Sequence, residues 1–316
     1  MIKQKKNDTG IISSPLPVGG GGIIFLHKKP GVTSFQALGR IKKVLNTGKV
    51  GHTGTLDKFA EGLLILLTGK LTRMNALITD LDKEYEALIR FGRETDTLDP
   101  EGETVAEADP PSLEAIESVI HQFKGEISQT PPRYSAIHID GRRAHELARS
   151  GKEVEMPSRE ITIHDIEILG YENNDLKLRV HCSKGTYIRS LARDIGTACN
   201  SRAYVQELVR TAVGPFSLDT AVDVENFRGP ADFYSWEEFF LKLGNSRILT
   251  LNELGLKRMK DGIPFRKEFL SVPAQDSIVL KNDETEYLLL KDSEGILKAV
   301  LEYRDGRYQY KINLCS

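Results

Sequence analysis

Hydrophobic and polar positions in the first part of the chain follow the patterns of a strand and an amphipathic helix. The apolar run at residues 23–26 predicts a short buried strand. After the turn at residues 29–31, Thr33 or Ser34 is expected to cap a helix, because either side chain can accept a hydrogen bond from a free backbone N–H. The predicted helix carries an apolar stripe at three-residue steps, formed by Phe35, Leu38, Ile41 and Val44.

Two later segments alternate apolar and polar residues with the period of a half-buried strand. Their apolar faces consist of Tyr85, Ala87, Ile89 and Phe91 in the first and of Leu176, Leu178, Val180 and Cys182 in the second. The second strand leads into residues 184–196, where Ile188, Leu191 and Ile195 have helical spacing. Ser112 is expected to cap a further helix, whose apolar stripe is Leu113, Ile116, Val119 and Phe123.

The pattern changes at three places along the chain, which suggests a division into parts. Residues 1–20 are polar and run into four glycines at 19–22, which predicts a mobile tail. Residues 129–160 contain two adjacent prolines and several arginines, and we expect a lid or excursion from the main sheet. From about residue 249 a short helix at 252–262 and brief strands at 277–281, 286–291, 296–303 and 308–314 predict a small β-rich module. The expected domains are therefore 21–248 and 249–316.

Composition narrows the class of protein. The chain has 316 residues, of which 40% are hydrophobic and 28% charged, as in ordinary globular proteins. No apolar run approaches the roughly 20 residues that span a bilayer, and the basic N-terminus lacks a secretory apolar stretch, so we expect a cytoplasmic protein. Three cysteines without CxxC spacing and seven histidines without an HxxxH pair argue against a disulfide framework and against a metal site.

Charge is segregated along the chain although the net charge is only −2. Residues 27–50 contain six Lys or Arg and no acidic residue, and 177–210 contain seven against Asp194 and Glu207. Residues 129–152 contain five against two acidic residues, whereas 94–117 are strongly acidic. Such clustering is compatible with a basic face for nucleic-acid phosphates or with an ordinary solvated surface, and charge alone leaves both interpretations open.

A loop rich in glycine and threonine, GHTGTLDKFAEG at residues 51–62, is the segment with the clearest candidate chemistry. Its glycines at 51, 54 and 62 allow tight turns and close approach of a ligand to the backbone. The loop contains a single aspartate, Asp57, but an aspartate in such a loop is more often a turn or cap residue than a nucleophile. Spacing alone therefore does not assign a catalytic role.

Six separated motifs in a fixed order resemble the TruB family of tRNA pseudouridine synthases. The loop motif GHTGTLD with AEGLL follows KPGVTS at residues 29–34. The others are KEY at 83–85 with FGRETDT at 91–97, PRYSA at 132–136, CSKGTYIRSL at 182–191 and GPF at 214–216. The resemblance covers roughly residues 23–218.

The resemblance implies an enzyme that isomerises the uridine at position 55, in the T-loop of tRNA, after flipping the base out of the loop. It implies an α/β (α+β) pseudouridine-synthase fold with a largely antiparallel mixed sheet, and a small PUA-like C-terminal module. No cofactor is required, because the N1–C1′ bond is replaced by a C5–C1′ bond without a change of redox state.

Three residues match the family's catalytic positions: Asp57, Arg189 and Tyr85. The Asp57 carboxylate can stabilise or attack C1′, but attack at C6 of uracil and proton removal from C2′ are equally compatible with the sequence. Arg189 is implied to pair with Asp57 and keep it ionised, and Tyr85 is implied to stack on the target base. Lys58 departs from the family, in which many members have proline after the aspartate, and we expect a less rigid loop.

The remaining matches are implied to contact RNA. His52 would insert into the T-loop where the base leaves, and Lys29 would contact a phosphate or support the loop. Leu208 would belong to the apolar wall of the uracil pocket. The RNA-binding set consists of His52, Lys29, Tyr187, Leu208, Gly54 and Thr55.

The expected partner is tRNA, held by its T-arm and, through Lys257, Arg258, Lys260 and Arg266 of the C-terminal module, by its acceptor stem. We expect a monomer without an obligatory protein partner. Two alternatives remain open: a protein that binds or refolds tRNA without needing the chemistry, and a guide-RNA-dependent enzyme that works within a ribonucleoprotein.

Overall fold

A computed structural model describes residues 21–135, 138–139, 142–143, 156–244, 246–271, 287–304 and 306–315 of the chain. The predicted mobile tail at 1–20, the central part of the predicted lid at 129–160 and the predicted strand at 277–281 lie outside the described residues. Within them, no helix is both long and apolar enough to cross a membrane.

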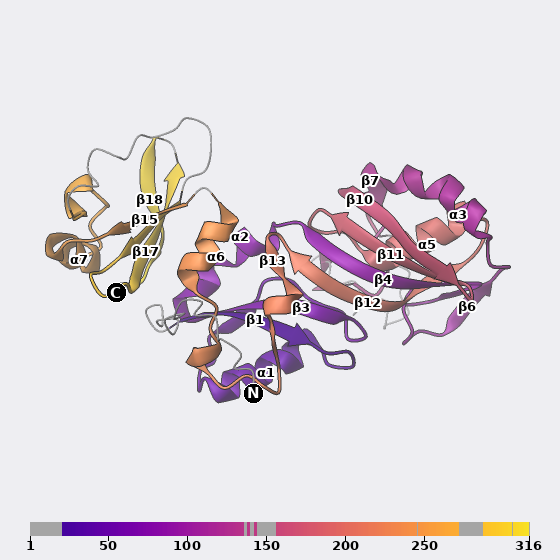
Figure 1. Cartoon of the computed structure of the whole chain (residues 1–316), viewed down its shortest axis with the longest axis horizontal. Coiled ribbons are helices and arrows are strands. Elements are labelled where there is room, and N and C mark those ends of the chain that lie inside the picture. The colour runs from indigo at the N-terminus through magenta and orange to yellow at the C-terminus, as the bar shows by residue number, and fades with distance from the viewer. Residues whose placement is uncertain are drawn as a thin grey trace, which may run out of the picture.

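One mixed sheet of ten strands forms the main body (Figure 1). Its path is β14 (Val222–Asp223), β1 (Ile23–Lys28), β3 (Glu61–Thr68), β12 (Ala203–Val213), β4 (Lys83–Phe91), β11 (Asp175–Cys182), β10 (Arg159–Glu172) and β7 (Gly125–Gln129), with β2 (Val50–His52) on β3 and β13 (Phe216–Ser217) on β12. Only the β1–β14 and β3–β12 pairs are parallel. The predicted largely antiparallel mixed sheet is therefore confirmed.

Helices cover one face of this sheet. They are α1 (Ser34–Val44), α3 (Leu113–Ile120) and α5 (Ile188–Ala198), while α2 (Asn75–Thr79) and α6 (Trp236–Leu243) pack elsewhere on the body. Short 3-10 helices lie at Gly69–Met74, His121–Phe123, Leu218–Thr220, Pro230–Asp232 and Lys267–Phe269, and small hairpins at β5 (Arg93–Thr95) with β6 (Thr104–Glu107) and at β8 (His138–Ile139) with β9 (Arg142–Arg143).

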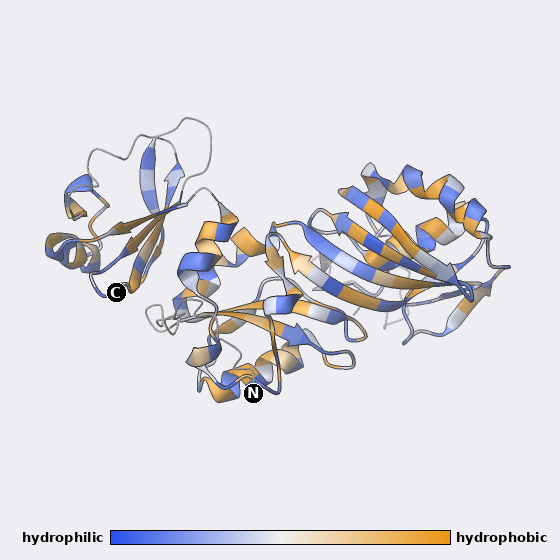
Figure 2. Cartoon of the chain, in the orientation of Figure 1, coloured by the Kyte–Doolittle hydropathy of each residue, from blue (hydrophilic) through white to orange (hydrophobic). Residues whose placement is uncertain are grey.

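The alternating segments form the strands that the sequence predicts. On β11, Leu176, Leu178, Val180 and Cys182 are all fully buried, and on β4 Ala87, Ile89 and Phe91 are buried. Figure 2 shows this alternation as blue and orange bands along the strands of the main sheet. The inward side chains pack on the predicted helix residues Ile188, Leu191 and Ile195 of α5 in one hydrophobic cluster.

Helix α1 corrects one prediction. Thr33 caps it as expected, in a capping box with Gln36. Leu38 and Ile41 are buried, but Phe35 and Val44, which were expected on the same stripe, are exposed. Each residue of a helix turns by about 100°, so positions three residues apart fall about 60° short of a full turn. Over the three steps from Phe35 to Val44 these differences add up to about half a turn. The first and last residues of the stripe therefore point in opposite directions, away from the buried face.

The second sheet consists of β15 (Ser246–Thr250), β16 (Tyr287–Lys291), β17 (Leu297–Arg304) and β18 (Arg307–Asn313), with α7 (Glu253–Lys260) beside it. It lies at the end of the molecule opposite β7 and α3 (Figure 1). The strands expected at 286–291, 296–303 and 308–314 and the helix at 252–262 are confirmed. Phe239 and Phe240 of α6 share a hydrophobic cluster with Leu289 and Val300, so α6 packs the second sheet against the main body.

Gly62 at the start of β3 fixes the loop before it, and its replacement is expected to be costly. The φ of Gly62 is +124°, and a Cβ would lie 2.4 Å from the carbonyl oxygen of Arg210 on the neighbouring parallel strand. Gly62→Ala therefore combines a strained backbone with a backbone clash, and we expect a loss of about 2–5 kcal/mol in the free energy of unfolding.

Urea unfolding of Gly62→Ala measures this loss, with Gly39→Ala in α1 as the matched control. A Cβ at Gly39 has open space within 4 Å, so that substitution is expected to stabilise the helix by about 0.5–1 kcal/mol. Equal stability of the Gly62→Ala variant and the unsubstituted protein would contradict the close approach of β3 to β12.

Candidate active site

A cleft of about 1160 Å³ opens between the loop of residues 52–58, the strands β4 and β12 and the first turn of α5. Of the residues that the sequence proposes for the site, Asp57, Arg189, Tyr85, His52, Tyr187, Leu208, Gly54 and Thr55 line this cleft. They come from segments up to about half the chain apart, and the sheet brings them together. Lys29 is not among the lining residues.

Asp57 and Arg189 form a two-pronged ion pair at the cleft. Arg189 Nε lies 2.9 Å from Asp57 Oδ2, and Arg189 Nη2 donates to Asp57 Oδ1 at 3.3 Å. The arginine side chain is 5% exposed and the aspartate 36%, so the guanidinium is buried beneath a carboxylate that still faces the cleft. The arginine thereby fixes the orientation of the carboxylate.

Arg189 is held by three further acceptors. Its Nη1 donates to the carbonyl of Thr97 at 2.9 Å and to Asp99 Oδ2 at 3.2 Å, and its Nη2 donates to the carbonyl of Tyr134 at 3.0 Å. Burial raises the pKa of the Asp99 carboxyl, while hydrogen bonding and the charge of Arg189 act in the opposite direction. The guanidinium is therefore shared between two carboxylates, one buried and one at the cleft.

A second buried arginine, Arg210 of β12, holds the backbone of the same loop. It is 3% exposed, and it donates to the carbonyls of Leu63 at 2.8 Å, Gly54 at 3.2 Å and Thr55 at 3.4 Å. The sequence reasoning missed this residue. The available signal was its place in the strand pattern, because Arg210 follows Leu208 by two residues and so occupies an inward position that is normally apolar.

The lysine beneath the loop is Lys28 rather than the proposed Lys29. Lys28 is fully buried, and its Nζ donates to the carbonyls of Ala60 at 2.6 Å, Val32 at 2.7 Å and Lys29 at 3.1 Å. Lys29 points away from the cleft, with its Nζ 3.3 Å from Asp223 and 3.4 Å from Glu61. Lys28 is the last residue of β1 and Lys29 is the next residue in the chain. Their side chains point in opposite directions, because successive side chains of a strand point to opposite faces of the sheet.

Burial lowers the pKa of Lys28 from 10.5 to about 8, with the charge of Arg210 adding to the effect and that of Asp57 opposing it. Between these two pH values the unfolded chain binds a proton on Lys28 that the folded protein releases. Stability therefore rises with pH through this window, by up to about 3 kcal/mol, relative to a protein without the amine.

Urea unfolding of the unsubstituted protein and of Lys28→Met between pH 7 and 10.5 tests this pH dependence. We expect the free energy of unfolding of the unsubstituted protein to increase with pH relative to that of the Lys28→Met variant. A constant difference across the window would show that Lys28 stays protonated in the folded protein.

Two aromatic side chains occupy the cleft wall beside Arg210. Tyr85 is half-buried on β4 directly opposite Arg210 in the strand register. Burial raises the pKa of Tyr85 and lowers that of His52, on which the charge of Arg210 acts in the same direction. At neutral pH the phenol is protonated and the imidazole neutral, so both rings can stack on or donate to a ligand without carrying charge.

Tyr187 stands at the start of α5 and is fixed from two sides. Gln129 of β7 accepts from the Tyr187 backbone N–H at 2.8 Å and donates to its carbonyl at 3.1 Å. The guanidinium of Arg159 lies over the tyrosine ring at 4.6 Å from its centroid. This stacked pair adds a cation and an aromatic surface to the cleft, which both residues line.

Lys58, which follows Asp57, lies at the cleft rim and pairs with Glu101. Both side chains are close to half exposed, and pairs of that kind stabilise a protein by about 0–1 kcal/mol. The Lys58 carbonyl accepts from the backbone N–H of Gly31 at 2.8 Å. The loop is thus held by its backbone at the position where proline would otherwise restrict it.

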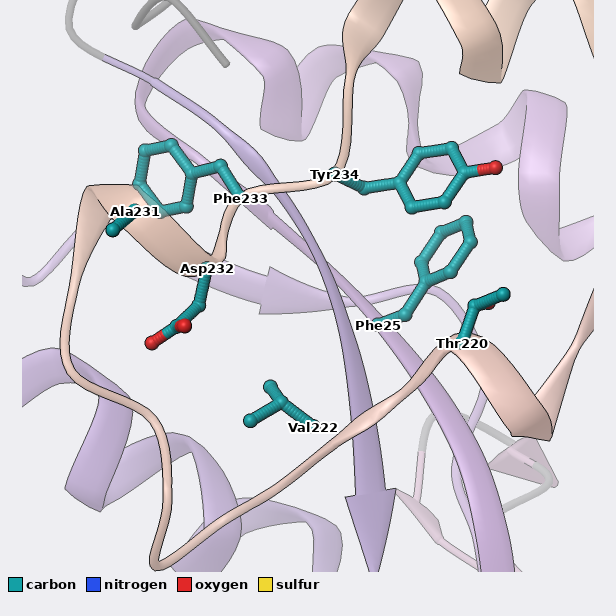
Figure 3. A pocket seen from close by; sticks show the side chains of 7 residues that line it. All are labelled: Phe25, Thr220, Val222, Ala231, Asp232, Phe233 and Tyr234. Atoms are coloured by element: carbon teal, nitrogen blue, oxygen red, sulfur yellow. The ribbon is translucent and has the colours of Figure 1, made fainter. Parts of the chain in front are cut away.

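A smaller hollow of about 250 Å³ lies between β1 and residues 220–234 (Figure 3). Phe25 and Tyr234 stack in it with their ring centroids 4.1 Å apart, and Asp232 is its one carboxylate. None of its lining residues forms an acid–base pair with another, so the larger cleft is the candidate active site. Among the described residues, no three or more His, Cys, Asp or Glu side chains are grouped so as to hold a metal ion.

Comparison with known proteins identifies relatives that match most of the chain. Residues 42–188 match the model of the TruB family pseudouridylate synthase (N terminal domain). The tRNA pseudouridine synthase B of Borreliella burgdorferi (strain ZS7) is 43% identical over 280 residues, which cover 88% of this chain and 96% of the relative. The tRNA pseudouridine synthase B of Treponema denticola is 49% identical over 219 residues, covering 63% of this chain and 61% of the relative.

Solved structures share the fold. A chain of a Cbf5-Nop10-Gar1 complex superposes with a TM-score of 0.64 at 23% identity, covering 93% of this chain and 85% of that chain. A chain of an H/ACA RNP bound to a substrate RNA containing 2′-deoxyuridine gives a TM-score of 0.61, covering 92% and 82%. The mixed α/β fold with a second β-rich module, expected from the sequence, is therefore confirmed.

Proposed function

Because the chain belongs to the TruB family of pseudouridylate synthases, we propose that it converts the uridine at position 55, in the T-loop of tRNA, to pseudouridine. The observation that carries this proposal is the ion pair between Asp57 and the buried Arg189 at the floor of a cleft large enough for a flipped nucleotide.

We assign the reacting carboxylate to Asp57. The reaction breaks the N1–C1′ bond, turns the uracil and forms a C5–C1′ bond, while the hydrogen on C5 is lost and N1 gains a proton. A carboxylate oriented by Arg189 can bond to C1′, attack C6 or take the C2′ proton, so each of these routes uses the same group. Burial of Arg189 strengthens the pair and excludes water behind it.

The other cleft residues are assigned to positioning of the base and the RNA. Tyr85 and Leu208 supply an apolar wall against which uracil can turn, and His52 supplies a neutral ring that can replace stacking lost from the T-loop. Tyr187 supports the wall from α5. Gly54 and Thr55 keep the backbone of the loop open to the nucleotide, since Arg210 binds their carbonyls from behind.

We further propose the domain roles. Residues 21–248 are the catalytic domain, and 249–316 a PUA-like module that contacts the acceptor stem through Lys257, Arg258, Lys260 and Arg266. The first three lie in the last turn of α7, where their charges are also favourable for the helix. We propose that the protein acts as a monomer without an obligatory protein partner and without a cofactor.

Mapping pseudouridine at every position of an unmodified tRNA transcript, treated with the purified protein alone, tests the proposal. We expect modification at position 55 and at no other uridine. Modification elsewhere would overturn the site, and a folded protein that binds the transcript but leaves it unmodified would favour the binding-only or the guide-dependent alternative.

Affinity for tRNA is expected to fall steeply with salt if the basic segments contact phosphates. For six or more contacts, the dissociation constant should rise by at least about 10³-fold between about 50 and 200 mM salt. Fluorescence anisotropy with labelled tRNA and the Asp57→Asn protein measures this without turnover. A flat response would contradict a phosphate-binding basic face.

A further inference from the structure

The side chain of Phe35, on the first turn of α1, is 77% exposed. Other large hydrophobic side chains that are exposed in the described part of the chain, such as Leu241 at 60% and Val105 at 59%, are less accessible. Phe35 belongs to none of the three hydrophobic clusters of the protein. A single exposed apolar residue requires no explanation by itself, so its surroundings decide whether it has a role.

Those surroundings are the rim of the cleft. Phe35 lines the same cleft as Asp57 and Tyr85, as do its neighbours Thr33 and Ser34. An aromatic ring at the mouth of an RNA-binding cleft meets unpaired bases, whose faces stack on aromatic side chains.

The position of Phe35 relative to Asp57 is fixed by two hydrogen bonds. The hydroxyl of Ser34 donates to the carbonyl of Leu56 at 3.1 Å and accepts from the Leu56 backbone N–H at 3.0 Å. Ser34 directly precedes Phe35, and Leu56 directly precedes Asp57. These hydrogen bonds therefore connect the start of α1 to the loop of residues 52–58. The ring therefore stands on a helix whose first turn is fixed relative to the loop that carries Asp57.

The charge around the ring favours a polyanion. Lys42 Nζ lies 5.8 Å from the Phe35 ring centroid, and Arg40 and Lys43 belong to the same helix. The first turn of α1 contains no acidic residue, so its free N–H groups add partial positive charge at this rim. These cations favour an anionic partner over a purely apolar one, and the exposed aromatic ring among them suits the unpaired bases of a nucleic acid.

We propose that Phe35 is a stacking platform for an unpaired base of the RNA substrate adjacent to the flipped uridine, and that Lys42 pairs with the phosphate beside that base. This inference rests on the proposed function and adds a specificity-determining residue to it. When a base flips out, the neighbouring bases lose their stacking contact with it. A rigid aromatic ring at the rim of the cleft gives one of these neighbours a new stacking partner.

Steady-state kinetics of four variants on a tRNA transcript test the platform. Phe35→Ala and Phe35→Leu are expected to lower kcat/KM about tenfold, the effect of losing one base–aromatic stack, mainly through KM. Phe35→Tyr keeps the ring and should stay within about twofold of the unsubstituted protein. Leu241→Ala, a comparably exposed apolar side chain of α6 away from the cleft lining, should leave kcat/KM unchanged.

Two outcomes would overturn the proposal: unchanged kcat/KM in Phe35→Ala, or activity in Phe35→Leu equal to that in Phe35→Tyr, which would show that apolar area suffices. Both require that the unsubstituted protein modifies the transcript. Absence of modification by the unsubstituted protein instead contradicts the proposed function, and leaves the stacking to be decided by the fluorescence below.

Tryptophan fluorescence reports stacking directly. The chain has one tryptophan, Trp236, which is 4% exposed, so Phe35→Trp in an Asp57→Asn background adds an exposed reporter at the rim. We expect the added emission to be quenched on titration with tRNA, while the Asp57→Asn protein without the reporter shows little change. Binding of tRNA without quenching would overturn the platform and favour a protein partner for this surface.

Discussion

Replacing Asp57 with asparagine is expected to abolish pseudouridine formation while leaving the fold and the affinity for tRNA nearly unchanged. Asparagine matches the shape of aspartate but cannot bond to C1′, add to C6 or accept the C2′ proton as an ionised carboxylate does. Removing a group that bonds to the reacting atoms typically costs about 10⁴-fold or more in kcat.

The fold is expected to tolerate this change because Arg189 keeps other acceptors. Thr97, Tyr134 and Asp99 still receive hydrogen bonds from the guanidinium, at 2.9, 3.0 and 3.2 Å, so its charge stays compensated by the buried carboxylate. Thermal unfolding and anisotropy with tRNA should therefore give values close to those of the unsubstituted protein.

A matched control tests whether the loss of activity is specific to the carboxylate of Asp57 or follows from replacing any ion-paired aspartate. Asp165 pairs with Lys124 at 2.7 Å, is 62% exposed and lies outside the cleft lining. Asp165→Asn should retain full activity. If Asp57→Asn instead retained more than about 1% of the kcat, the reacting carboxylate would have to be another group, and Asp99 would be the first to examine.

The strands and helices that dominate the core could be predicted from the sequence because their signals are local. On β11 every second residue from Leu176 to Cys182 is buried, and the helix that follows buries Ile188, Leu191 and Ile195. The wrong prediction for α1 also has a local cause. A three-residue repeat is close to the helical period of 3.6 residues, so its central members Leu38 and Ile41 are buried, but its end members Phe35 and Val44 lie outside the buried face.

The active site could not be predicted from spacing, because its parts meet only through the sheet. Asp57 and Arg189 lie in a loop and a helix far apart in the chain, and resemblance to the TruB family supplied their pairing. Lys28 and Arg210 were missed since each contacts backbone carbonyls, and the acceptors are not recognisable in a sequence. The one available indication was a charged residue at an inward strand position.

Counting charge along the chain overestimates the basic surface. Lys177 and Arg179 pair with Glu86 of the neighbouring strand, and Lys184 pairs with Asp80. Arg189 and Arg210, in the same basic segment, are buried. Arg193 pairs with Asp194 at 2.8 Å, so six of the seven basic residues at 177–210 are ion-paired or buried within the protein. The phosphate contacts that we propose must therefore rely more on α1, Arg159 and α7.

Replacing Arg189 with methionine is expected to destabilise the protein as well as inactivate it, in contrast to Asp57→Asn. Methionine fills much of the space, but Asp99, whose side chain is 9% exposed, loses its cation, and Asp57 loses its ion pair and the hydrogen bond from Arg189 Nη2. Breaking a buried ion pair from one side costs about 3–5 kcal/mol. Arg189→Lys should regain part of this stability but little activity, since an ammonium cannot hold both carboxylates in the planar arrangement.

The cause of the lost stability can be isolated with the double variant Arg189→Met, Asp99→Asn. It removes the uncompensated carboxylate, so urea unfolding should show it to be more stable than Arg189→Met alone at neutral pH. Burial already raises the pKa of Asp99 above its usual 3.8, and loss of the arginine raises it further.

The sign of the pH dependence follows from that shift. A carboxyl whose pKa is raised on folding favours the folded state when it is protonated, and this contribution is lost as pH rises through the folded-state pKa. The stability gap between the double variant and Arg189→Met should therefore be small near pH 3.8 and widen towards neutral pH. A gap independent of pH would mean that lost packing around residue 189, and not the buried charge of Asp99, destabilises the single variant.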